Sequence, residues 1–157
     1  MDDFAIKADQ LIKRYAFRSS LTGFIPIPLI DTLGLIGVQQ VMLYSLAKLY
    51  GVPYSKARAK TRIAGLTSGL TTTVATPMLG SALKLIPGVG TLVGGASMAV
   101  LGSASTYAVG KVFQRHFEAG GNLDDFDPKV AKETFNTEFK KGKELSRKKK
   151  QPSKNAE

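Results

Sequence analysis

The sequence predicts an all-α protein of four to five helices with a central glycine-rich helical hairpin. Apolar residues recur at helical spacing between breaks marked by Pro and Gly, and no stretch shows a convincing strand alternation. The stretch from Ile63 to Gly110 carries one charged side chain, Lys84, and nine of the chain's 16 glycines. A chain of 157 residues corresponds to about one domain with its own core.

Residues 2–20 are predicted to form an amphipathic helix. One apolar stripe follows the helical repeat, formed by Phe4, Ala8, Leu11, Ile12 and Tyr15. Basic side chains lie largely off this stripe. The pattern is typical of a surface helix on a core, and the alternative is a helix lying in a membrane interface.

A second helix is predicted from Pro28 to Tyr50, where a Gly-Val-Pro sequence stops it. It is apolar nearly all round, which predicts burial. Asp31 and Gln39 are its candidate buried polar residues, about two turns apart. A buried carboxylate must be paired, hydrogen-bonded or neutral, so Asp31 is assigned a structural role ahead of a proton-handling one.

The third and fourth helices form the predicted hairpin. The third follows a candidate N-cap at Ser55 and ends or kinks at Pro77, and the fourth runs from Pro87–Thr91 to about Ala119. Lys84 separates two uncharged segments of 21 and 26 residues, and a helix needs roughly 20 residues to cross a bilayer. The pair is either a membrane hairpin or a tightly packed part of a soluble core.

Small residues on the hairpin are predicted to be helix-packing or oligomerisation positions. A Gly in a helix interior costs roughly 0.5–1 kcal/mol against Ala, so many such residues need a packing reason. Small faces let another helix approach closely. The positions assigned to this role are Gly65, Gly69, Gly88, Gly95 and Gly102.

The last helix is predicted from Pro128 to about Leu145, followed by a basic, disordered tail. The predicted division is therefore 1–20, 21–121, 122–145 and 146–157, namely first helix, glycine-rich core, last helix and tail. Basic clusters near the end are candidate contacts with an anionic surface, lipid ahead of nucleic acid. These residues are Lys140, Lys141, Lys143, Arg147, Lys148, Lys149 and Lys150.

No enzymatic chemistry is predicted, and no cofactor or metal. The chain has no Cys and only one His, His116, which rules out disulfides and multi-His metal sites. The glycines at 88–95 match no phosphate-binding pattern. The aspartates of the 122–127 loop lack the later ligands of a calcium loop, so helix capping is the expected role.

Several short pieces of the chain resemble a known family: Ile25–Asp31, Gln39 or Gln40, Ala47–Gly51, Ile86–Gly90 and Ala104–Gly110. The resemblance is to the YcjF-like, GTPase-associated bacterial family, domain-of-unknown-function family 697, and covers roughly Ala16–Phe117. The EcsC-like family shares a similar Pro-Gly-Val-Gly turn. The resemblance implies a helical domain often attached to a small GTPase domain or found in membrane proteins, with no agreed catalytic residues.

The leading functional hypothesis is a non-enzymatic, membrane-associated helical protein that self-associates through small-residue faces. Membrane lipids and a second copy of the chain are its expected partners, at the inner membrane with both termini cytoplasmic. One alternative is a soluble, cytoplasmic all-α adaptor that acts with a separate GTPase. Another alternative is a pore-forming antibacterial effector, a property that the resemblance implies for some relatives.

Overall fold

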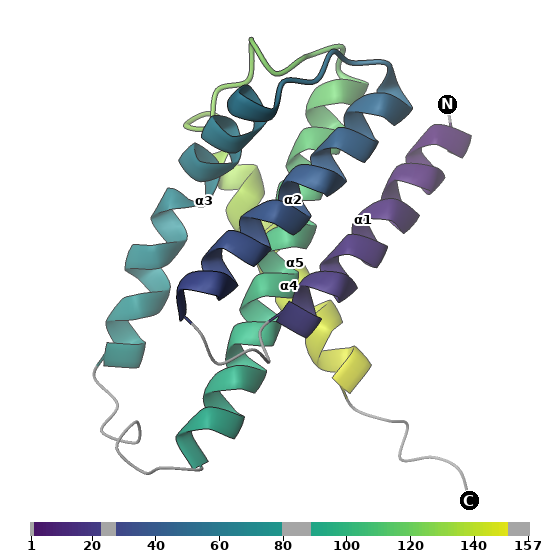
Figure 1. The fold of residues 1–157 in the computed structure, drawn as a ribbon. Coiled ribbons are helices and arrows are strands. Elements are labelled where there is room, and N and C mark those ends of the chain that lie inside the picture. The colour runs from purple at the N-terminus through teal and green to yellow at the C-terminus, as the bar shows by residue number, and fades with distance from the viewer. Residues whose placement is uncertain (1, 23–27, 80–88, 151–157) are drawn as a thin grey trace, which may run out of the picture.

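The computed structural model describes residues 2–22, 28–79 and 89–150, and within them the chain forms five α-helices (Figure 1). The all-α prediction is confirmed, and the described ranges contain no strand. The first four helices lie close to their predicted boundaries. The helices are α1 (Asp2–Thr22), α2 (Pro28–Tyr50), α3 (Lys56–Leu79), α4 (Val89–Glu118) and α5 (Lys132–Lys150).

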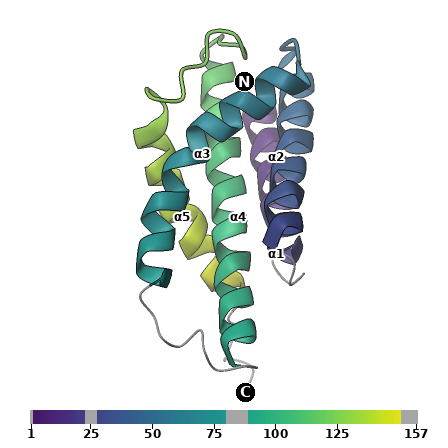
Figure 2. The same ribbon diagram turned by 60° about the vertical axis from the view of Figure 1, so that its left-hand side comes forward.

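The long helix α4 is the centre of the bundle. It packs against α1 and α2 on one side and α5 on the other, while α3 lies against α2 and α4 (Figure 2). Helices α3 and α4 run antiparallel, as a hairpin requires, and the link between them lies outside the described residues. Among the described residues α4 packs mainly on α1 and α5, so the predicted hairpin is part of a larger bundle.

The two ends of the bundle differ in what they contain. The lower end in Figure 1 holds the ends of α1, α3 and α5 and the starts of α2 and α4. The upper end holds the α2–α3 link and the long α4–α5 connection. We use the terms lower end and upper end in this sense below.

Aromatic side chains fill the core towards the upper end. Phe113 of α4 stacks on Phe126 with ring centroids 4.3 Å apart, and both are buried. Phe126 and Leu123 come from the α4–α5 connection and are buried against the helices. Burying such side chains contributes roughly 1.5–3 kcal/mol each, so this connection is anchored in the core.

The helix ends at Gly51 and Gly120 have a clear physical basis. These two glycines have φ values of 68° and 86°, in the left-handed region that only Gly adopts at low cost. After Gly51 the amide of Val52 donates to the carbonyl of Ala47 at 2.8 Å. The chain therefore leaves α2 and α4 through ordinary left-handed caps.

The last helix differs from its prediction at both ends. It begins at Lys132 because residues 128–131 form turns, in which the Asp127 carboxylate accepts a hydrogen bond from the Lys129 amide at 2.8 Å. It continues past Leu145 to Lys150, so the first part of the predicted disordered tail is helical. The helical stripe of Phe135 and Phe139 holds α5 on the core.

Candidate functional site

Two close helix contacts define the interface of α1, α4 and α5. A Cβ atom added at Gly110 would lie 2.7 Å from Ile12 Cγ1 of α1. A Cβ atom added at Gly142 would lie 2.9 Å from the Cα atom of Ala104. Because these two glycines have no side chains, α1 and α5 can each approach α4 closely. The surface formed by the three helices has two grooves.

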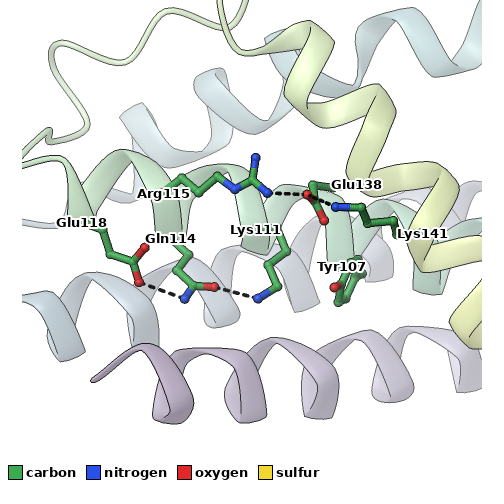
Figure 3. A pocket seen from close by; sticks show the side chains of 7 residues that line it. All are labelled: Tyr107, Lys111, Gln114, Arg115, Glu118, Glu138 and Lys141. Carbon is green, nitrogen blue, oxygen red and sulfur yellow. Dashed lines mark hydrogen bonds and ion pairs between the residues drawn. The ribbon is translucent and has the colours of Figure 1, made fainter. Parts of the chain in front are cut away.

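The polar groove has a volume of about 330 Å³ and is formed by α4 and α5 (Figure 3). Arg115 Nη2 and Lys141 Nζ approach the same Glu138 oxygen, at 2.6 and 3.0 Å. Glu138 is 2% exposed, whereas the side chains of both cations remain more than half exposed. A buried carboxylate needs such partners, so this contact fixes α5 on α4.

A second series of polar side-chain contacts runs from α1 across α4 to α2. Lys111 pairs with Asp9 at 2.6 Å and donates to Gln114 at 3.1 Å. Gln114 donates to Glu118 at 2.9 Å, and the hydroxyl of Tyr50 donates to the same carboxylate at 2.8 Å. The charges of this groove are matched within the protein, which indicates a structural role.

The pKa shifts agree with that role. Burial raises the pKa of Asp9, but the ammonium groups of Lys111 and Lys13 outweigh it and the net pKa is lowered. Burial, with the hydrogen bond to Glu118, raises the pKa of Tyr50 to about 12. Asp9 is therefore charged and Tyr50 is neutral at physiological pH, as their hydrogen bonds require.

The apolar groove lies nearer the lower end, where α1, α4 and α5 leave a space of about 510 Å³. Ala16 and Phe17 come from α1, Ala99 and Val100 from α4, and Leu145 from α5. Phe17 is 51% exposed and Leu145 is 42% exposed, so large apolar side chains face solvent on two of its sides. Tyr107 lines both grooves and marks the point where the polar surface gives way to the apolar one.

Helix α5, which forms one side of the apolar groove, carries several basic side chains. Lys148 lines it, while Lys140 and Arg147 are exposed on the same helix and Lys143 lies over the ring of Phe139 at 6.0 Å. No ion pair between described residues involves any of these four. Lys141 differs, because it pairs with Glu138. The side chains of Lys149 and Lys150 lie outside the described residues.

The structure places Gln39 in a buried polar cluster. Its side-chain amide donates to Ser105 Oγ at 3.1 Å and reaches Thr106 Oγ1 at 3.4 Å, and Gln39 is 1% exposed. Ser19 Oγ lies 2.7 Å from Thr106 Oγ1, so the cluster joins α1, α2 and α4. The side chain of Asp31 lies outside the described residues.

The predicted packing glycines have neighbours within the chain where these are described. A Cβ atom at Gly65 would lie 3.0 Å from Pro128, and one at Gly102 would lie 3.4 Å from the carbonyl oxygen of Ser19. Gly88 lies outside the described residues, as do the surroundings of Gly69 and Gly95.

Sequence reasoning did not identify Glu138, Tyr107 or Phe17 as site residues. Glu138 lies three positions before Lys141, a spacing at which helical side chains meet, but that spacing does not reveal burial. Phe17 lies off the predicted apolar stripe of α1. That position in the sequence pattern could have indicated that its side chain faces outward, as it does in the structure.

The aspartates of the α4–α5 connection hold that segment in place. Asp124 pairs with Arg58 at 2.7 Å, and Asp125 accepts the amide of Asn122 and lies 2.9 Å from His116 Nε2. Although Asp125 is exposed, the Asn122 amide and His116 lower the pKa of this carboxylate. His116 is thus a partner within the fold. In the described part of the chain, no three His, Cys, Asp or Glu residues are grouped as a metal site.

The sequence suggested that the hairpin could insert into a membrane, because its two segments are uncharged. Among the helices of the described ranges, none combines the length and the apolar character needed to cross a bilayer.

Comparison with known proteins identifies the family. The family described as Domain of unknown function (DUF697) matches residues 2–143. Magnetosome membrane protein 22 of Magnetospirillum gryphiswaldense is 34% identical over 142 residues, which cover 90% of this chain and 73% of that protein. No solved structure matches the chain. The resemblance to family 697 is therefore confirmed, and the chain belongs to the DUF697 family.

Proposed function

We propose that this protein is a non-enzymatic, membrane-associated helical protein that docks on anionic lipid through the lower end of its bundle. The observation that carries the proposal is the apolar groove between α1, α4 and α5, with exposed Phe17 and Leu145 beside basic α5. Large exposed apolar surface on a soluble fold commonly marks an interaction site. Basic side chains around it favour a negatively charged partner surface.

The apolar and basic side chains reinforce each other at this end. Phe17, Leu21 and Leu145 expose apolar area that gains about 25 cal/mol per Å² when it leaves water. Each Lys or Arg near an anionic bilayer contributes about 1 kcal/mol at low salt. Several residues of both kinds together suffice for reversible binding, which single weak contacts do not.

The magnetosome relative supports a membrane role, since its name describes a membrane protein. We extend that role to this chain at the inner membrane, with both termini on the cytoplasmic side. The GTPase association implied by the family resemblance is the alternative, in which the same surface binds a protein.

Self-association is also part of the proposal. Gly65 and Gly102 pack within the chain. Gly95→Leu is expected to remove cross-linked oligomers on vesicles. Gly102→Leu is expected to lower the melting temperature, because its side chain would meet α1 and α2. Oligomers that survive Gly95→Leu would contradict self-association through Gly95.

The direct test is flotation of the full chain with vesicles. Binding is expected with vesicles that contain phosphatidylglycerol and not with purely zwitterionic ones. The double variant Phe17→Ser/Leu145→Ser should float much less. Val41→Ser/Tyr44→Ser is the matched control, because these α2 side chains are 52% and 50% exposed and lie outside the groove.

The outcomes separate the functions. Equal flotation of both double variants would overturn docking at the lower end. A wild-type chain that floats with neither vesicle type would overturn the membrane role and favour the adaptor. Release of a trapped dye at low protein concentration would instead favour the pore-forming effector.

A further inference from the structure

The apolar groove has an interior that needs no polar ligand. Ser20 Oγ donates to the Phe17 carbonyl at 2.6 Å. Ser146 Oγ lies 3.0 Å from Ser103 Oγ and 2.8 Å from the Gly142 carbonyl. The three serine hydroxyls among the lining residues are thus bonded within the protein. An occupant therefore meets mainly hydrocarbon.

The size of the groove restricts the occupant. Its volume of about 510 Å³ lies within the roughly 300–1,000 Å³ of sites for small molecules. A groove of this size suits a narrow, flexible chain.

The charges at the groove restrict the occupant further. Lys13 and Lys148 belong to its lining, on α1 and α5 respectively. Lys13 is paired with Asp9 at 2.7 Å, whereas no ion pair between described residues involves Lys148. An apolar channel with a cation at its edge matches a hydrocarbon chain that carries an anionic head.

We propose that the groove holds one acyl chain of an anionic membrane phospholipid, with the phosphate of its headgroup beside Lys148. The inference rests on the proposed membrane role and gives it a specific lipid contact. Phe17 and Leu145 would cover the acyl chain from two sides, and Val100 lines the side of the groove formed by α4. Docking then includes the withdrawal of one lipid tail into the protein.

The test uses the full chain and vesicles containing a phosphatidylglycerol with a photoreactive group near the end of one acyl chain. After illumination, cross-linked peptides are mapped by mass spectrometry. Labelling is expected in the groove segments 99–107 and 142–148. Val100→Trp fills the groove, and Ser20→Phe blocks it from a partly exposed position that spares the core. Val41→Trp is the control, on the exposed side of α2.

Val100→Trp and Ser20→Phe are expected to lose the groove labelling, and Val41→Trp should keep it. Groove labelling that persists in both filled variants, or labelling confined to other segments, would overturn the acyl-chain site while docking stands. Failure of the wild-type chain to float would overturn the proposed function and this inference together.

Discussion

The polar and apolar grooves are neighbours on α4, α5 and the adjoining face of α1, yet their chemistry differs sharply. In the polar groove, Glu138 is buried and matched by two cations. In the apolar groove, Phe17 and Leu145 are exposed, and Lys148 has no ion pair with another described residue. The charges of the polar groove are matched within the protein, whereas the apolar groove exposes large apolar side chains. Helix α5 thus holds the bundle together and also carries the docking surface that we propose.

Tyr107 lies at the boundary between the two grooves. It is 8% exposed and lines both grooves, and burial raises the pKa of its hydroxyl. Gly142 lies next to it on α5, where a Cβ atom would be 3.2 Å from the Tyr107 ring. The change from polar to apolar surface thus coincides with a close approach of α5 to α4.

The largest expected effect comes from breaking this approach. Gly142→Leu would drive a side chain into the backbone of Ala104, since even a Cβ atom would lie 2.9 Å from its Cα. We expect a loss of about 3 kcal/mol or more in the free energy of unfolding. Gly34→Ala is the control, because no atom lies within 4 Å of its Cβ position; it should gain roughly 0.5–1 kcal/mol. Urea unfolding measures both, and equal stability of the two variants would contradict the packing role.

The next effect concerns the polar groove. Glu138→Gln removes the charge that faces Arg115 and Lys141 and keeps the shape of the side chain. We expect a loss of about 1–3 kcal/mol in stability, with unchanged vesicle binding. Glu144→Gln, an exposed position on the same helix, should leave stability within about 0.5 kcal/mol. A marked loss of vesicle binding in Glu138→Gln would show that the two grooves do not have separate roles.

Charge removal at the lower end should change binding and leave stability unchanged. Lys143→Gln/Lys148→Gln removes two cations, and about 1 kcal/mol for each predicts a roughly 30-fold weaker affinity for anionic vesicles at low salt. Lys56→Gln/Lys60→Gln removes two exposed cations near the upper end and should bind like the wild type. If both pairs weaken binding equally, net charge alone would explain the affinity.

The smallest expected effect is the acid response of Asp9. Its pKa is lowered in the folded protein, so its contribution to stability is present above the ordinary value of 3.8 and is lost as the pH falls through the folded pKa. Asp9→Asn should lack this contribution at neutral pH and show a smaller loss on acidification. Urea midpoints measured between pH 3 and 7 for both proteins test it, and parallel pH profiles would contradict the paired state.

Local signals made most of the fold predictable. Pro28 at the start of α2 and the caps at Gly51 and Gly120 are encoded in a few adjacent residues. The start of α5 was wrong by one turn, because a proline at 128 fits a turn as well as a first helical turn. Its last residues stay helical beyond the apolar stripe, which the side-chain pattern alone does not indicate.

The candidate site was far less predictable, because it depends on which helices meet. The pairing of Glu138 with Arg115 and the 2.7 Å contact between Ser19 and Thr106 join distant segments. The contact of Gly142 with Ala104 follows only from the position of α5 on α4. The basic residues of α5 were visible in sequence, whereas their division between Lys141 in an ion pair and Lys148 at the groove required the structure.

The most direct measurement of the central claim places one environment-sensitive fluorophore at each end of the bundle. The chain has no Cys, so Leu145→Cys at the apolar groove and Val130→Cys, 80% exposed near the upper end, can each carry a single label. Docking through the lower end predicts a blue-shifted, brighter signal from position 145 on vesicles containing phosphatidylglycerol, and an unchanged signal from position 130. An equal response at both positions, or a response at position 130 alone, would contradict it.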